Sequence, residues 1–153
     1  GGCVGGAVDM VTAACIRYAS ADAFFCIQEI NIGMVADVGT LQRLPKLLPM
    51  ALVKELAYTG RIVQGEEAVA LGLATRVVAD PLAEALRLAH EIAARNPDAI
   101  RANKRLFNAV ADVRVSDAQL LMAESEEQNK LIGSPNQTEA VRANLEKRAP
   151  RFV

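Results

Sequence analysis

Three carboxylates near glycines and apolar side chains are the residues best suited to chemistry in this chain. Asp9 follows the pair Gly5-Gly6, while Glu29 and Asp37 flank an apolar stretch that contains a further glycine. Acids placed among apolar residues are costly to ionise unless they are paired or hydrogen-bonded. A pocket that held these three acids would suit proton transfer by general acid–base catalysis.

The glycine pair indicates how such a pocket would polarise a substrate. Gly5-Gly6 precedes the segment 8–16, whose apolar residues predict a buried helix. Glycine tolerates positive φ and allows a ligand to approach the backbone closely. The first N–H groups of a helix lack intrahelical partners, and the helix dipole favours negative charge there. The turn therefore predicts an oxyanion hole, although tight packing of a helix against a strand explains the same glycines without chemistry.

The elements expected to position these residues fall into two regions. Up to about residue 80 the sequence mixes short strands and helices, and from Pro81 onward the pattern is helical. Strands are predicted at 24–27 and 73–78, and helices at 41–48, 51–58, from Pro81, 98–111, 116–132 and 138–147.

Composition narrows the functional classes. The 153 residues are 52% hydrophobic and 23% charged with a formal net charge of −1, which argues against a nucleic-acid partner. No apolar stretch reaches the ~18 residues of a membrane span. Cys3, Cys15 and Cys26 form an odd set without metal-ligand spacing. We therefore expect reduced cysteines, no metal and an intracellular protein that interacts with neither membrane nor nucleic acid.

The order of the motifs resembles the crotonase (enoyl-CoA hydratase/isomerase) superfamily over the whole chain, Gly1–Val153. The similar segments are 5–9, 16–19, 24–29, 39–45, 59–61, 68–73, 104–106 and 147–152. The resemblance implies an α/β fold: a partial crotonase-type ββα spiral in residues 1–95, then a helical trimerisation region in 96–153. It also implies that Gly6, beside Gly5, gives one backbone N–H to a thioester oxygen.

The three acids resemble those of one subfamily, the Δ3,5-Δ2,4-dienoyl-CoA isomerases. Ordinary hydratases of the superfamily carry glutamates at the positions of Asp9 and Glu29 and a glycine at that of Asp37. The resemblance implies isomerisation of 3,5-dienoyl-CoA to 2,4-dienoyl-CoA in fatty-acid β-oxidation. Glu29 would transfer a proton at C2 and Asp37 at C6, while Asp9 would orient or stabilise. No separate cofactor is implied, because coenzyme A is part of the substrate.

Two other functions stay open at this point. One is a 2-enoyl-CoA hydratase with a variant acid pair, and the other is a non-catalytic crotonase-like subunit. The presence of Asp37 favours an isomerase over the hydratase, because a hydratase needs no acid at that position. The superfamily's N-terminal part, which carries the second oxyanion N–H and most of the CoA pocket, has no counterpart in the chain. We therefore expect this polypeptide by itself to be inactive.

The resemblance also implies partners and a location. The expected partners are an acyl-CoA thioester and further copies of the chain, as a trimer or a dimer of trimers. We expect a cytoplasmic protein from a bacterium, or a mitochondrial or peroxisomal protein if the source is eukaryotic.

Overall fold

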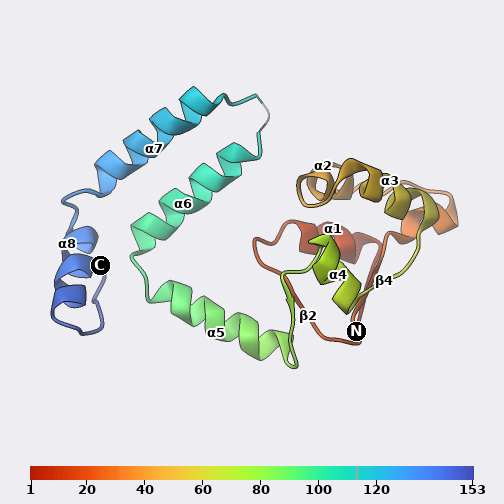
Figure 1. Cartoon of the computed structure of the whole chain (residues 1–153), viewed down its shortest axis with the longest axis horizontal. Helices are drawn as coiled ribbons and strands as arrows, with labels where there is room; N and C mark the ends of the chain where they lie inside the picture. The colour runs from red at the N-terminus through yellow and green to blue at the C-terminus, as the bar shows by residue number, and fades with distance from the viewer. Residues whose placement is uncertain (113) are drawn as a thin grey trace. The chain divides into compact units, whose positions relative to one another are not determined.

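Short strands and helices alternate in the first part of the chain, and helices alone follow (Figure 1). The computed structural model describes residues 1–112 and 114–153. It divides into two compact units, Gly1–Ala85 and Leu86–Val153. The chain passes from one unit to the other within α5 (Pro81–Ala93), whereas the sequence prediction set the boundary after residue 95. The predicted α/β class, with mostly helical content, is confirmed.

Two small sheets organise the first unit. In the larger sheet β1 (Gly2–Val4) pairs in parallel with β3 (Phe24–Cys26), which pairs antiparallel with β4 (Val63–Gln64). The smaller sheet pairs β2 (Tyr18–Ala19) in parallel with β5 (Arg76–Val77). The strand predicted at 73–78 is therefore too long, because the N–H of Ala74 instead donates to the carbonyl of Ala68, within the helix Gly65–Leu71.

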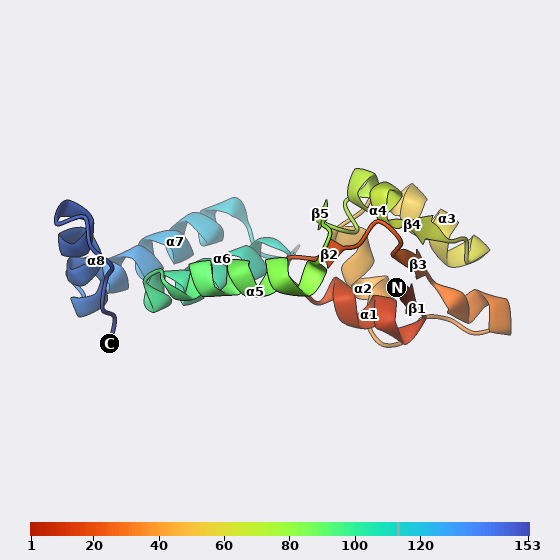
Figure 2. The same cartoon turned by 90° about the horizontal axis from the view of Figure 1, so that it is seen from below.

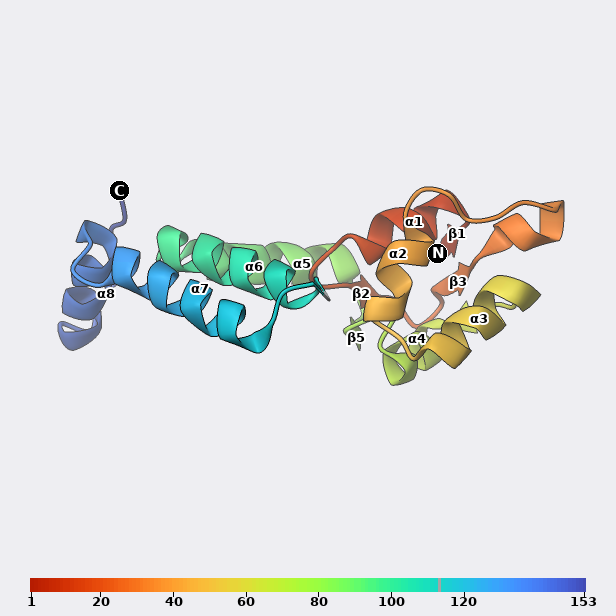
Figure 3. The same cartoon turned by 90° about the horizontal axis from the view of Figure 1, so that it is seen from above.

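Helices cover both faces of the larger sheet. Figures 2 and 3 show β1 and β3 between α1 on one side and α3 with α4 on the other. The helices of this unit are α1 (Gly6–Thr12), α2 (Thr40–Arg43), α3 (Met50–Thr59) and α4 (Gly65–Leu71), with 3₁₀ helices η1 (Gln28–Ile32) and η2 (Leu44–Lys46).

Two helix predictions need correction. The helix expected at 8–16 ends at Thr12, whose hydroxyl donates to the carbonyl of Asp9 at 2.8 Å and so competes with the helical ladder. The helix expected at 41–48 divides into α2 and η2 near Pro45, which has no N–H to continue the α-helical pattern.

The core of the first unit lies between the larger sheet and its helices. Its most buried large side chains are Val8, Leu44 and Val63, each at most 2% exposed. Burial of such a side chain contributes about 1.5–3 kcal/mol. These contacts fix α1, η2 and β4 on one another and thereby position the glycine turn.

The second unit is a set of helices. It contains most of α5, then α6 (Pro97–Val110), α7 (Asp117–Leu131) and α8 (Pro135–Leu145), and α6 lies beside α7 (Figure 1). Ser116 begins α7 with a capping box to Gln119. The helix predicted at 138–147 begins earlier, because Ser134 caps it and Pro135 fits the first turn.

Polar contacts attach the end of the chain to α8. The Asn136 Nδ2 atom donates to the carbonyl of Val153 at 3.0 Å and to the Asp98 carboxylate at 2.8 Å. Hydrogen bonds from the Arg148 guanidinium and the Arg151 N–H lower the pKa of Glu139 to about 2. Within the described ranges, no helix is both long enough and apolar enough to cross a membrane.

Candidate active site

The two glycines of the turn have different roles in the structure. Gly5 has φ 57° and ψ −126°, which glycine adopts far more readily than other residues, and its N–H donates to the carbonyl of Cys26 at 2.9 Å. A Cβ at Gly5 would lie 3.2 Å from the Glu29 Oε1 atom. Gly6 is exposed, and a Cβ there would meet no atom within 4 Å. The backbone therefore requires glycine at position 5, whereas Gly6 leaves open space at the start of α1.

This difference predicts opposite effects of alanine on stability. Gly5→Ala should lower the free energy of unfolding by about 1–3 kcal/mol, because alanine would adopt a disfavoured backbone conformation. Gly6→Ala, its matched control, should change that free energy by no more than about 0.5 kcal/mol. Urea denaturation of both variants measures the difference. Equal stability of the two variants would contradict the assignment of Gly5 as the conformationally required glycine.

Asp9 is buried behind the turn. Asp9 is 0% exposed, and its Oδ1 atom accepts a hydrogen bond from the N–H of Thr40 at 2.8 Å. The carboxylate therefore satisfies an N–H in the first turn of α2 and joins that helix to α1. This contact suits the predicted orienting role better than proton transfer to a ligand.

Glu29 lies beside the glycine turn at the entrance to η1. Its Oε1 atom is the nearest neighbour to a Cβ placed on Gly5, and its Oε2 atom is buried without a hydrogen-bond partner. Burial raises the pKa of the nearby Cys26 thiol, and the Glu29 carboxylate raises it further. The structure thus brings together the predicted oxyanion turn and one predicted acid.

Glu29 also faces a cavity of about 400 Å³ with mostly apolar walls. One wall comes from a single face of α3, on which Met50, Val53 and Ala57 recur at helical spacing. The opposite wall comes from the segment after β3. Its residues, apart from Glu29, are Ile27, Ile30, Met34, Val35, Ala36, Leu41 and Pro45, and α3 adds Lys54 and Tyr58. A cavity of this size and lining suits an apolar ligand fixed by a few polar groups.

Asp37 lies on the loop between η1 and α2. Its side chain is exposed and makes no hydrogen bond or ion pair with the described part of the chain. The preceding residue, Ala36, is buried and lines the same cavity as Glu29. The structure therefore places the backbone of Asp37 at the edge of the cavity, but shows no contact between its carboxylate and the other two acids.

Unsatisfied polar atoms gather in this region. Among the described residues, the buried side-chain atoms without a hydrogen-bond partner are Asp9 Oδ2, Glu29 Oε2 and Thr40 Oγ1. Buried polar groups are nearly always paired in folded proteins, and exceptions are often functional. The two predicted acids near the turn therefore retain unused hydrogen-bonding capacity, as expected where a ligand or a proton is handled.

Three residues near the site were missed by the sequence prediction. Thr40 and Arg43 lie within the recognised segment 39–45, but no periodicity reveals that they bond to α1. Tyr58, near the end of α3, lines the cavity and has 70% of its surface exposed.

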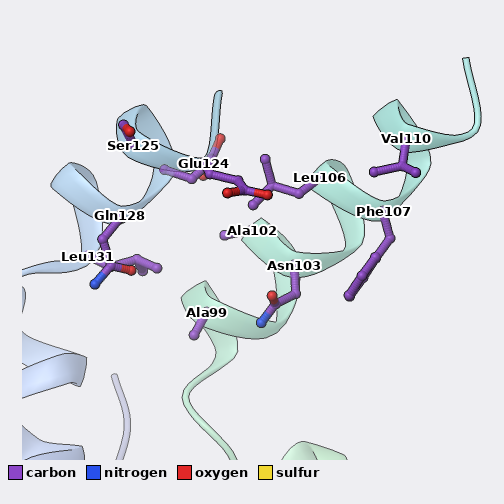
Figure 4. Close-up of a pocket in the computed structure, with 11 residues that line it drawn as sticks. Ala99, Ala102, Asn103, Leu106, Phe107, Val110, Glu124, Ser125, Gln128 and Leu131 are labelled. Carbon is purple, nitrogen blue, oxygen red and sulfur yellow. The ribbon is translucent and has the colours of Figure 1, made fainter. Parts of the chain in front are cut away.

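A second cavity, of about 530 Å³, lies in the helical unit (Figure 4). Figure 4 draws Leu106 and Phe107 on α6 and Glu124 and Gln128 on α7 around it. None of the predicted site residues lines this cavity. It is open and mainly apolar, and exposed apolar side chains border it. We therefore interpret it as a groove on the surface of α6 and α7.

Comparisons with known proteins identify relatives that match from two thirds of the chain to all of it. A family model described as enoyl-CoA hydratase/isomerase matches residues 1–153. The mitochondrial Delta(3,5)-Delta(2,4)-dienoyl-CoA isomerase of Homo sapiens is 50% identical over 108 residues, 68% of this chain and 33% of that protein. The peroxisomal enzyme of the same name from Arabidopsis thaliana is 39% identical and covers 100% of this chain and 55% of that protein.

A solved structure gives the same fold. A probable enoyl-CoA hydratase/isomerase from Mycobacterium abscessus superposes with a TM-score of 0.95 at 29% identity, over 100% of this chain and 63% of that chain. This chain therefore spans 33% to 63% of the length of the three proteins compared.

Proposed function

Because the chain belongs to the enoyl-CoA hydratase/isomerase family, we propose that it carries the catalytic acids of a Δ3,5-Δ2,4-dienoyl-CoA isomerase. The observation that carries the proposal is the position of Glu29, which lies beside the glycine turn and also lines an apolar cavity. The dienoyl-CoA isomerases among its relatives support the choice of reaction. Asp37 supports it further, because an acid distant from the thioester is needed for a proton shift along a diene.

The reaction moves one proton equivalent across five carbons. The thioester oxygen would lie at the N-terminus of α1, where the Gly6 N–H and the helix dipole stabilise negative charge. Polarisation of the thioester acidifies the protons on C2, and the Glu29 carboxylate removes one of them to give an enolate conjugated as far as C6. The protonated Asp37 carboxyl then donates its proton to C6. Glu29 releases its proton to water, and Asp37 takes one up, before the next turnover. The double bonds at C3 and C5 thereby become double bonds at C2 and C4, without a redox step or a separate cofactor.

Asp9 would support this chemistry without touching the diene. Its bond to the Thr40 N–H holds α2 against α1, close to the loop that carries Asp37. The apolar cavity would hold the acyl chain, because burial of methylene groups contributes about 0.8 kcal/mol each. Glu29, as the carboxylate on the wall of that cavity, is then close to the reacting end of the chain.

A substrate assay separates this proposal from hydration. A 3,5-dienoyl-CoA and a 2-enoyl-CoA are offered in turn, and products are identified by ultraviolet absorbance and mass. We expect the first to become its 2,4-isomer with unchanged mass. Efficient conversion of the second to a product heavier by one water would favour the 2-enoyl-CoA hydratase, a reading supported by the solved hydratase/isomerase of the same fold. Loss of both activities in the whole protein would favour the non-catalytic subunit.

We further propose that the first unit forms part of the crotonase ββα spiral and that the helical unit joins copies of the chain into a trimer or a pair of trimers. Large apolar side chains are exposed on α6 and α7, including Phe107, Val110, Leu121 and Met122. Their exposed surface would be covered by association of identical chains. The proposed pathway is fatty-acid β-oxidation, in a bacterial cytoplasm or in the mitochondrial or peroxisomal compartments named for the eukaryotic relatives.

A further inference from the structure

Arg43 links the loop that carries Asp37 to helix α1. Its Nη2 atom donates to the carbonyl of Asp9 at 2.7 Å and to the carbonyl of Val38 at 2.8 Å. Its Nε atom donates to the Thr12 hydroxyl at 3.1 Å. One guanidinium therefore bonds both to the helix that contains the buried acid and to the residue that follows the exposed acid.

The backbone conformation around Arg43 allows its guanidinium to make these hydrogen bonds. Gly39 has φ 109°, and a Cβ there would overlap the Arg43 guanidinium, so glycine allows the side chain to cross the loop. The N–H of Ala13 donates to Met10, so the Asp9 carbonyl near the end of α1 accepts side chains instead, the Thr12 hydroxyl and Arg43. A cation near the carbonyl end of a helix is also favoured by the helix dipole.

The acceptors of Arg43 are also informative. The three acceptors are two backbone carbonyls and one hydroxyl, none of them a carboxylate. By contrast, Arg61 in the same unit pairs with the carboxylates of Glu55 and Glu67. Arg43 thus fixes the positions of two backbone segments and does not neutralise an acid. Its planar guanidinium, with several N–H donors in fixed directions, suits that role better than a lysine ammonium.

The other end of the same loop is fixed at Glu29. The N–H of Met34 donates to the Glu29 carbonyl at 2.9 Å, and Ala36 is buried in the core. On the far side, the N–H of Thr40 donates to Asp9. The backbone on both sides of Asp37 is therefore anchored, although the Asp37 side chain itself is exposed.

We propose that Arg43 is a positioning residue for Asp37, holding the loop so that the distal acid faces the acyl chain at a fixed separation from Glu29. The proposal rests on the isomerase function proposed above. Proton transfer depends steeply on the placement of the acid, and a misplacement of about 1 Å can cost about 10²-fold in rate. Arg43 acts through the carbonyl of Val38, without contact to the substrate.

Steady-state kinetics of Arg43→Gln and Arg43→Lys in the whole protein test the proposal. We expect Arg43→Gln to lower kcat about 10²-fold while KM for 3,5-dienoyl-CoA changes less than about threefold. Arg43→Lys keeps the positive charge but lacks the planar guanidinium with its several N–H donors, so its kcat should stay close to that of Arg43→Gln. Arg61→Gln is the matched control and should leave kcat unchanged, whatever its effect on the melting temperature.

A double-mutant cycle with Asp37→Asn separates positioning from general stability. If Arg43 acts through Asp37, then adding Arg43→Gln to Asp37→Asn should lower kcat by less than about threefold further, because interacting residues are non-additive. Additive losses, or full kcat in Arg43→Gln, would overturn the proposal.

Hydrogen exchange gives a readout that does not need the isomerase activity. Arg43→Gln should speed exchange of the Thr40 amide in a peptide spanning residues 33–42, whereas Arg61→Gln should not. Unchanged exchange in Arg43→Gln would overturn the anchoring role. Faster exchange in a protein that turns over no dienoyl-CoA would instead count against the proposed function while leaving the anchor intact.

Discussion

In the whole protein, Asp37→Asn should remove most isomerisation of 3,5-dienoyl-CoA while leaving binding of the thioester nearly unchanged. Asparagine matches aspartate in size but neither donates a carboxylic proton nor accepts one. A single general acid or base typically contributes about 10²–10⁴-fold in rate. Because Asp37 is exposed and its side chain makes no hydrogen bond or ion pair with the described part of the chain, its replacement should have little effect on folding.

Turnover of a 3,5-dienoyl-CoA and the dissociation constant of a non-reactive acyl-CoA measure the two effects separately. The matched control is Asp117→Asn, which makes the same substitution in the first turn of α7, outside the proposed site. It should retain parental turnover. An Asp37→Asn protein that isomerises at the parental rate would remove Asp37 from the mechanism. Hydration of a 2-enoyl-CoA by the same variant would then support the hydratase as the function.

The helices were predictable from the sequence because their signals are local. Ser116 and Gln119 supply a capping box three residues apart, and Pro81 and Pro97 stand at the first positions of α5 and α6. One error arose where a side chain bonds to the backbone of its own helix. The hydroxyl of Thr12 bonds to the carbonyl of Asp9, and neither residue type announces that α1 will end there.

The residues of the site were predictable as types, but their contacts were not. The Asp9 bond to Thr40 spans 31 positions and depends on how α2 packs on α1. The approach of Glu29 to Gly5 likewise follows from the pairing of β1 with β3. Periodicity within one element carries no information about such pairs. The same limit hid Arg43, whose acceptors lie on two separate segments.

The cavity beside Glu29 illustrates a further limit. The apolar residues of α3 recur at helical spacing, which predicts one buried face. In the structure both Val53 and Met50 line the cavity, but Val53 is buried in the core whereas Met50 is 53% exposed. Sequence patterning identifies the face but cannot tell which of its residues stay accessible in the pocket, because that accessibility depends on the loop opposite.

Gly6→Val should reduce isomerisation about 10²–10³-fold without unfolding the protein. The valine side chain would occupy the open space at the start of α1, where the thioester oxygen is proposed to lie against the Gly6 N–H. Loss of one oxyanion donor costs about 3–4 kcal/mol of transition-state stabilisation in a comparable enzyme site. The fold should persist, because no atom lies within 4 Å of a Cβ at this position and Gly6 does not require positive φ.

The matched control is Ala7→Val, at the next exposed position of α1, which introduces the same branched side chain into the same helix turn. Circular dichroism and urea denaturation should show both variants folded, and only Gly6→Val should lose turnover of the 3,5-dienoyl-CoA. The loss should appear in kcat more than in KM, because the N–H bonds most strongly to the enolate-like oxygen of the transition state. A folded Gly6→Val protein with parental kcat would mean that the thioester oxygen is stabilised elsewhere and that the glycine turn serves only the packing of α1.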